Sequence, residues 1–146
     1  MKNPKPLCNF ENIENKVSDI INKKNWDLLI KSFKKAEHIY VIGNGGNWAV
    51  ATHAAVDLAR LTGKKVFSLD STCYVTSIAN DVGYENVFAR WLNLYSDEKK
   101  KSLLISFSAT GTSKNIINAI NWSNRRKNFN NFLLTAQAKN NKKLKT

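Results

Sequence analysis

A histidine and an aspartate, His53 and Asp57, lie four residues apart in the first half of the chain. The segment around them, residues 48–61, favours a helix because it contains no proline and no internal glycine. Side chains four residues apart share one face of a helix. An imidazole and a carboxylate placed in this way could bind a metal ion or transfer protons. The plainer alternative is a surface pair with only local electrostatic value.

A glycine-rich loop immediately precedes this helix. Residues 39–42 form a short β-branched and aromatic run, typical of a buried strand, and residues 43–47 follow it. The glycines Gly43, Gly45 and Gly46 can adopt backbone angles closed to other residues, so the main chain can approach a ligand closely. The unpaired N–H groups at the start of the helix favour an anion, so a phosphate is the expected ligand.

A second loop of similar design follows another apolar run, residues 103–107, which is typical of a buried strand. It contains four hydroxyl side chains around one glycine: Ser108, Thr110, Gly111, Thr112 and Ser113. Hydroxyls and helix-start amides can donate several hydrogen bonds to a phosphate without a lysine. The alternative is that the cluster forms only a turn and the N-cap of a helix at 114–122.

The rest of the chain supplies the elements that must position these loops. Two amphipathic helices are expected over residues 9–22 and 26–36, because apolar residues recur there at helical spacing. Further expected elements are strands at 65–69 and 131–135, a short helix at 75–79 and a longer helix at 87–95. Strands that alternate with helices favour an α/β fold with a parallel sheet.

Four motifs, taken in order, resemble the sugar isomerase (SIS) domain of phosphoheptose isomerases. They occupy residues 43–46, 53–57, 76–88 and 108–120. The resemblance implies a three-layer α/β/α sandwich with a parallel sheet, the flavodoxin-like SIS fold. It also implies one domain with three parts: N-terminal helices that make oligomer contacts (1–37), a sugar-phosphate-binding core (38–136) and a basic tail (137–146).

The same resemblance implies roles for single residues. It implies that Ser108, Thr110 and Ser113 hold the phosphate, in the loop that includes Gly111 and Thr112. It implies that the facing loop is lined by Asn44, Gly45, Gly46 and Asn47. It also implies that Asp81 contacts sugar hydroxyls. It assigns proton transfer to Asp57 and implies that His53 can ligate zinc. The matched residues alone, His53 and Asp57, leave such a metal site incomplete, and no other cofactor is expected.

Two departures from the family bear on catalysis. Asp57 is one methylene shorter than the family's glutamate, and a misplacement near 1 Å can cost on the order of a hundredfold in rate. The family's final helix, which carries a glutamine and the histidine thought to act as base, has no match in residues 137–146. The expected function is a sugar-phosphate-binding, phosphoheptose isomerase-like aldose–ketose isomerase. The alternative is a non-catalytic SIS binding or regulatory module, for example a partner of a replication initiator.

Composition narrows the range of partners. The net charge of +12 raises the question of an acidic partner, but the lysines are scattered and no nucleic-acid motif accompanies them, so nucleic acid is not expected. No apolar run reaches membrane-spanning length and the N-terminus lacks a signal peptide, so we expect a cytoplasmic protein. The expected partners are a phosphorylated sugar and further copies of the chain, in a homodimer or homotetramer.

Overall fold

The computed structural model describes residues 13–21 and 24–136. It divides into two compact units, Met1–Lys31 and Ser32–Thr146. The first unit contains α1 (Ile13–Ile21) and the first part of α2 (Lys24–Lys35). These helices match the two that were expected at 9–22 and 26–36, as far as those segments are described. The organisation as one domain remains a prediction, and the basic tail at 137–146 lies outside the described residues.

A parallel sheet with strand order β2-β1-β3-β4 forms the centre of the second unit. The strands are β1 (His38–Gly43), β2 (Lys65–Ser68), β3 (Ser102–Phe107) and β4 (Phe129–Leu134). The register places His38 beside both Lys65 and Ser102, and Ser102 beside Phe129. All four strands therefore start at one edge of the sheet and end at the opposite edge, which confirms the parallel sheet.

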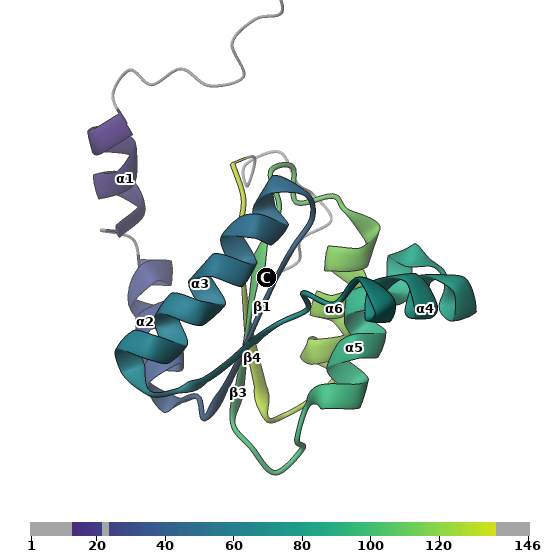
Figure 1. The fold of residues 1–146 in the computed structure, drawn as a ribbon. Coiled ribbons are helices and arrows are strands. Elements are labelled where there is room, and N and C mark those ends of the chain that lie inside the picture. Colours follow the sequence, from purple (N-terminus) through teal and green to yellow (C-terminus); the bar gives the residue numbers. More distant parts are fainter. Residues whose placement is uncertain (1–12, 22–23, 137–146) are drawn as a thin grey trace, which may run out of the picture. The chain divides into compact units, whose positions relative to one another are not determined.

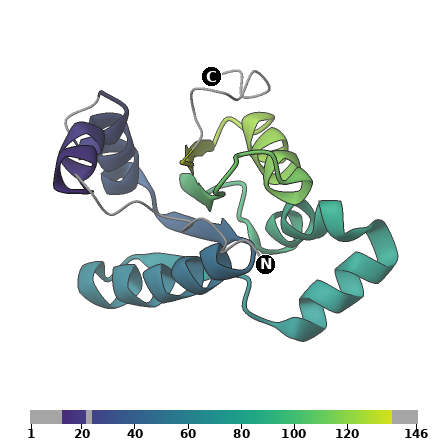
Figure 2. The ribbon, with the colours of Figure 1, turned by 90° about the horizontal axis from the view of Figure 1, so that it is seen from above.

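Helices cover both faces of this sheet (Figures 1 and 2). The helix α3 (Gly46–Thr62) links β1 to β2 and packs on one face. On the other face lie α5 (Val87–Tyr95) and α6 (Lys114–Asn124). The three-layer sandwich implied by the resemblance is thereby confirmed.

One helix is longer than its expected range of 75–79. The observed helix, α4 (Thr72–Val82), is followed by the 3₁₀ turn η1 (Tyr84–Asn86). Ser71 caps the start of α4 by accepting a hydrogen bond from the Tyr74 backbone N–H, and Gly83 ends it with a positive φ of 84°. Serine and glycine are common at these two positions, so local signals for both ends were present in the sequence.

The strand β1 is buried on both faces, as expected for a central parallel strand. Its side chains alternate between the two faces, and Tyr40 and Ile42 belong to the large core that includes residues of α5 and α6. The Tyr40 ring stacks on Phe67 of β2 at 5.3 Å and on Phe129 of β4 at 5.8 Å between centroids. These stacked rings hold the strands together near the edge where they begin.

Two basic loops that are far apart in the sequence lie side by side at this starting edge. Residues 99–101 precede β3 and residues 125–127 precede β4. The Asn128 side-chain amide joins the loops by donating to the backbone carbonyls of Asp97 (3.2 Å) and Lys100 (2.9 Å). Their charges therefore lie at the opposite end of the strands from the two predicted ligand loops.

None of the helices in the described part of the chain has the length and apolar character needed to span a membrane.

Candidate functional site

The strands β1 and β3 are neighbours at the point where the sheet changes direction. After β1 the chain crosses to β2 on one side, and after β3 it crosses to β4 on the other. In open parallel sheets, ligands bind at the carboxyl ends of the strands at such a switch point. The glycine loop (43–47) follows β1 and the hydroxyl loop (108–113) follows β3, so the fold brings these two loops together.

The glycine loop needs glycine at two positions for two different reasons. Gly45 has a φ of 55° and a ψ of −123°, a backbone conformation that side chains disfavour. A Cβ on Gly43 would lie 2.6 Å from the carbonyl carbon of Asn47, because the first turn of α3 packs directly over this residue. Gly46 has no positive φ and nothing within 4 Å of an added Cβ, so it alone could carry a side chain without strain.

The hydroxyl loop is organised by its own hydrogen bonds. The buried Ser108 Oγ accepts from the backbone N–H of Gly111 at 3.1 Å, and Gly111 has a φ of 69°. The hydroxyl oxygens of Thr110 and Thr112 lie 2.7 Å apart, and both residues are exposed. Ser113 is the N-cap residue of α6 but makes no side-chain capping hydrogen bond. Part of the cluster thus forms a turn, while the Ser113 hydroxyl is not used to cap the helix.

A pair of interlocked side-chain amides joins the two loops. Asn44 Nδ2 donates to Asn115 Oδ1 at 2.9 Å, and Asn115 Nδ2 donates to Asn44 Oδ1 at 2.8 Å. The hydroxyl of Tyr84, from η1, donates to the same Asn44 oxygen at 3.2 Å. We had not predicted roles for Asn115 or Tyr84. The sequence signal was their position inside the motifs at 108–120 and 76–88. That signal does not reveal that Asn115 pairs with Asn44, which lies 71 residues away in the sequence.

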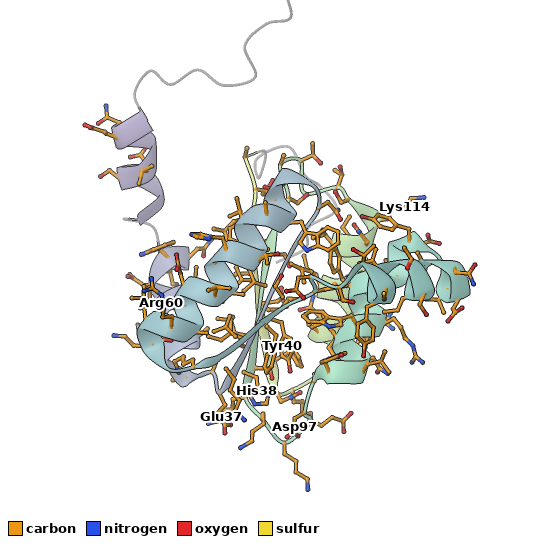
Figure 3. All side chains as sticks on the ribbon, in the orientation of Figure 1. Glu37, His38, Tyr40, Arg60, Asp97 and Lys114 are labelled. Carbon is orange, nitrogen blue, oxygen red and sulfur yellow. The ribbon has the colours of Figure 1, made fainter. Side chains whose placement is uncertain are left out.

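Lys114 is a second residue without a predicted role. It is the first residue of α6, directly after the hydroxyl loop, and its side chain is exposed. Figure 3 shows Lys114 towards the end of the molecule where the strands finish, and Glu37, His38 and Asp97 at the opposite end. A cation therefore lies beside the predicted phosphate loop, where sequence reasoning had invoked only neutral donors.

The pair expected on α3 is formed. His53 Nε2 lies 3.2 Å from Asp57 Oδ2, and the guanidinium of Arg60 lies 3.4 Å from Asp57 Oδ1. The His53 side chain is 80% exposed and that of Asp57 is 39% exposed. The imidazole and carboxylate thus face solvent on the outer side of α3, in a geometry that could pass a proton between them.

An open pocket connects His53 to the glycine loop. Its volume is about 540 Å³, and it is lined by Gly45, Trp48, Ala49, Thr52, His53, Val56 and Asp70. Asp57 and the hydroxyl loop do not line it. Asp81, at the exposed end of α4, accepts a hydrogen bond from the neighbouring Asn80 amide at 3.3 Å. The predicted contact of Asp81 with sugar hydroxyls stays a prediction.

The residues present do not fit a zinc site. His53 and Asp57 offer two ligand groups, whereas catalytic zinc sites use three protein ligands. Among the residues that the structure describes, no group of three or more His, Cys, Asp or Glu side chains could hold a metal ion.

Comparison with known proteins agrees with this geometry. The SIS domain family matches residues 9–127. The phosphoheptose isomerase of Buchnera aphidicola subsp. Schizaphis graminum is 32% identical over 128 residues, which is 84% of this chain and 64% of the relative. The phosphoheptose isomerase of Helicobacter pylori strain P12 is 37% identical over 66% of this chain and 53% of the relative. The chain thus spans between about half and two thirds of the length of these relatives.

Solved structures share the fold. The phosphoheptose isomerase from Neisseria gonorrhoeae superimposes with a TM-score of 0.71 at 24% identity, covering 84% of this chain and 66% of that protein. The tagatose-6-phosphate ketose/aldose isomerase from Escherichia coli superimposes with a TM-score of 0.59 at 21% identity, covering 84% of this chain and 30% of that protein. The match over residues 9–127, on a parallel sheet as expected, shows that this chain belongs to the SIS domain family.

Proposed function

We propose that this protein binds a phosphorylated sugar and catalyses an aldose–ketose isomerisation of the phosphoheptose isomerase type. The observation that carries the proposal is the amide pair of Asn44 and Asn115, which joins the glycine loop to the hydroxyl loop at the switch point of the sheet. Relatives of similar sequence are named phosphoheptose isomerases, which supports a phosphosugar as the ligand.

The hydroxyl loop is the part that would hold the phosphate. The start of α6 offers backbone N–H groups, and the exposed threonines and Ser113 offer hydroxyl donors beside it. Lys114 adds one positive charge at the same place. The glycine loop presents Asn44 to this site. Nothing lies within 4 Å of a Cβ added at Gly46, so a ligand has room to approach the Gly46 backbone.

The chemistry would fall to Asp57 and His53. Isomerisation of a ketose moves a proton from C1 to C2 through an enediol. Asp57 would take the C1 proton while the C2 carbonyl oxygen gains a proton from solvent, which gives the enediol. Asp57 would then deliver its proton to C2 while the C1 hydroxyl loses its proton to solvent, which leaves the aldose. His53 Nε2 lies 3.2 Å from Asp57 Oδ2, close enough to orient the carboxylate.

Proton NMR of the purified chain with sedoheptulose 7-phosphate in D₂O tests the proposal. Saturation transfer to the sugar measures binding, and deuterium incorporation next to the carbonyl measures formation of the enediol. We expect both in the unmodified chain, and loss of deuterium incorporation alone in Asp57→Asn. Asp97→Asn, at the opposite end of the strands, is the matched control (Figure 3). Absence of saturation transfer would refute sugar-phosphate binding.

A second function is favoured by the surroundings of Asp57. Its carboxylate contacts both His53 and Arg60 on the exposed side of α3 and does not line the open pocket. A carboxylate in that position suits a non-catalytic SIS module that binds a sugar phosphate without converting it. Saturation transfer without deuterium incorporation would identify this function. Capture of a protein partner such as a replication initiator would then be the next experiment.

The proposal extends to assembly and location. The helix that carries His53 and Asp57 also exposes three apolar side chains, Val50 (51%), Val56 (60%) and Leu61 (73%). Such exposed apolar side chains suit a contact between copies of the chain, in a homodimer or homotetramer. Sedimentation analysis should show one of these species, and a monomer at all concentrations would contradict it. Because charged sugar phosphates do not cross membranes unaided, we place the protein with them in the cytoplasm.

A further inference from the structure

The amide pair of Asn44 and Asn115 has an orientation that a single backbone group determines. The Ile116 N–H can only donate, and it points at Asn115 Oδ1 at 3.0 Å. This contact identifies the oxygen of the Asn115 amide, so its nitrogen must face Asn44. Asn115 is 3% exposed, so water has little access to its amide. The start of α6 thus sets which way both amides point.

The same bonds use up the acceptor capacity of Asn44. An amide oxygen has two lone pairs. Asn44 Oδ1 receives one hydrogen bond from Asn115 Nδ2 at 2.8 Å and another from the Tyr84 hydroxyl at 3.2 Å. Asn44 Nδ2 has two N–H groups, and one donates to Asn115 Oδ1 at 2.9 Å. One N–H donor therefore remains for a ligand.

Reversal of the Asn44 amide would be costly. It would place the nitrogen of Asn44 against the nitrogen of Asn115 and the two amide oxygens against each other, so the buried Asn115 amide would lose both of its partners on Asn44. The two loops would also lose the side-chain contact that joins them. The pair thus prevents Asn44 from exchanging its donor for an acceptor when a ligand arrives.

We infer that Asn115 is a positioning residue for the sugar-phosphate site: it holds Asn44 so that this side chain offers one N–H donor to an acceptor oxygen of the ligand. The inference rests on the proposed function. The expected partner of that donor is a phosphate or carbonyl oxygen, because both only accept. Asn44, which was expected to line the site, would act there only as a donor.

The test compares Asn115→Leu with Asn128→Leu in the full chain labelled with ¹⁵N. Leucine has the same branching and the same number of side-chain heavy atoms as asparagine but no hydrogen-bonding group. Asn128 is a matched control because its amide also donates across the fold, at the other end of the strands. Side-chain amide spectra report the Asn44 N–H groups, assigned through Asn44→Ala. Titrations with sedoheptulose 7-phosphate and with inorganic phosphate report affinity. Tyr84→Phe removes only the exposed hydroxyl and so tests the network without disturbing the core.

We expect the Asn44 amide signal to move on ligand binding in the unmodified chain. Asn115→Leu should shift that signal before any ligand is added and weaken binding about tenfold, while Asn128→Leu leaves both unchanged. Tyr84→Phe should shift the Asn44 signal and keep the thermal stability. If the unmodified chain and Asn115→Leu bind the ligand with equal affinity, the role of Asn115 is overturned while the proposed function stands. No binding of either ligand by the unmodified chain would overturn the proposed function, and with it the role of Asn115 toward that ligand.

Discussion

The His53 imidazole lies 3.2 Å from the Asp57 carboxylate across one turn of α3. Arg60 donates to the other oxygen of the same carboxylate, at 3.4 Å, so Asp57 is flanked by two side chains from its own helix. Its position is therefore set by α3 itself. This matters for the proposed catalysis, because the shorter aspartate cannot extend from the helix as far as a glutamate while keeping its contact with His53.

Replacement of Asp57 by the longer acid tests whether reach limits turnover. We expect Asp57→Glu to increase isomerisation of sedoheptulose 7-phosphate, by up to about a hundredfold, since a shift near 1 Å can change a rate by that factor. Deuterium incorporation in D₂O measures the effect, with Asp57→Asn as the inactive reference. Equal rates for the aspartate and the glutamate would show that reach is not the limit.

Lys114 should strengthen phosphate binding without stabilising the free protein. A lysine at the first position of α6 opposes the positive end of the helix dipole, at a cost of about 0.3–1 kcal/mol. When a phosphate is bound at this loop, the Lys114 charge attracts it, so the same lysine becomes stabilising in the complex. We expect Lys114→Met to weaken sugar-phosphate affinity roughly three- to tenfold and to reduce its salt dependence. Calorimetric titration at two salt concentrations measures both, and Lys99→Met at the opposite end should behave like the unmodified chain. Identical titrations for the two variants would count against a phosphate at this loop.

Two glycines of one loop should respond differently to the same substitution. A Cβ at position 43 would lie 2.6 Å from a backbone carbon of Asn47, so Gly43→Ala should lower the free energy of unfolding by about 1–3 kcal/mol. Gly46 begins α3 and has free space around it, so Gly46→Ala should change stability by less than about 0.5 kcal/mol. Urea denaturation compares the two. If the ligand approaches this backbone, Gly46→Ala should still weaken phosphate binding.

Tyr40 should make stability depend on pH in alkaline solution. Burial, reinforced by the charge of Asp97, raises the pKa of Tyr40 to about 12. The unfolded chain releases this proton near the ordinary value of 10, so between about pH 10 and pH 12 the folded state binds more protons than the unfolded state. The contribution to the free energy of unfolding is complete below pH 10 and is lost as pH rises through this window.

Tyr40→Phe provides the corresponding variant. It removes the hydroxyl that donates to the Tyr95 carbonyl at 3.2 Å, at a cost of about 1 kcal/mol near neutral pH. Its urea denaturation midpoint should then fall less steeply above pH 10 than that of the unmodified chain. A parallel fall in both proteins would mean that Tyr40 ionises equally in the folded and unfolded states.

Much of the fold was predictable because its signals are local. The helix α5 has the expected bounds of 87–95, and β1, β2 and β3 lie within one residue of theirs. Gly63 ends α3 in the left-handed conformation with a φ of 67°, as its position after a helical segment indicated. The full length of α4 was missed, although Ser71 and Gly83 were local signals for its two ends, because the expected range of 75–79 did not use them.

The sequence by itself determined the succession of strands and helices along the chain, the glycine and hydroxyl loops between them and the helical pairing of His53 with Asp57, because each depends on residues a few positions apart. Only the tertiary structure decided which groups meet across the sheet. It paired Asn44 with Asn115 over 71 residues and placed Asn47 against Gly43. Such contacts depend on strand order and on the packing of α3 and α6 over it, and neither leaves a periodic trace in the sequence.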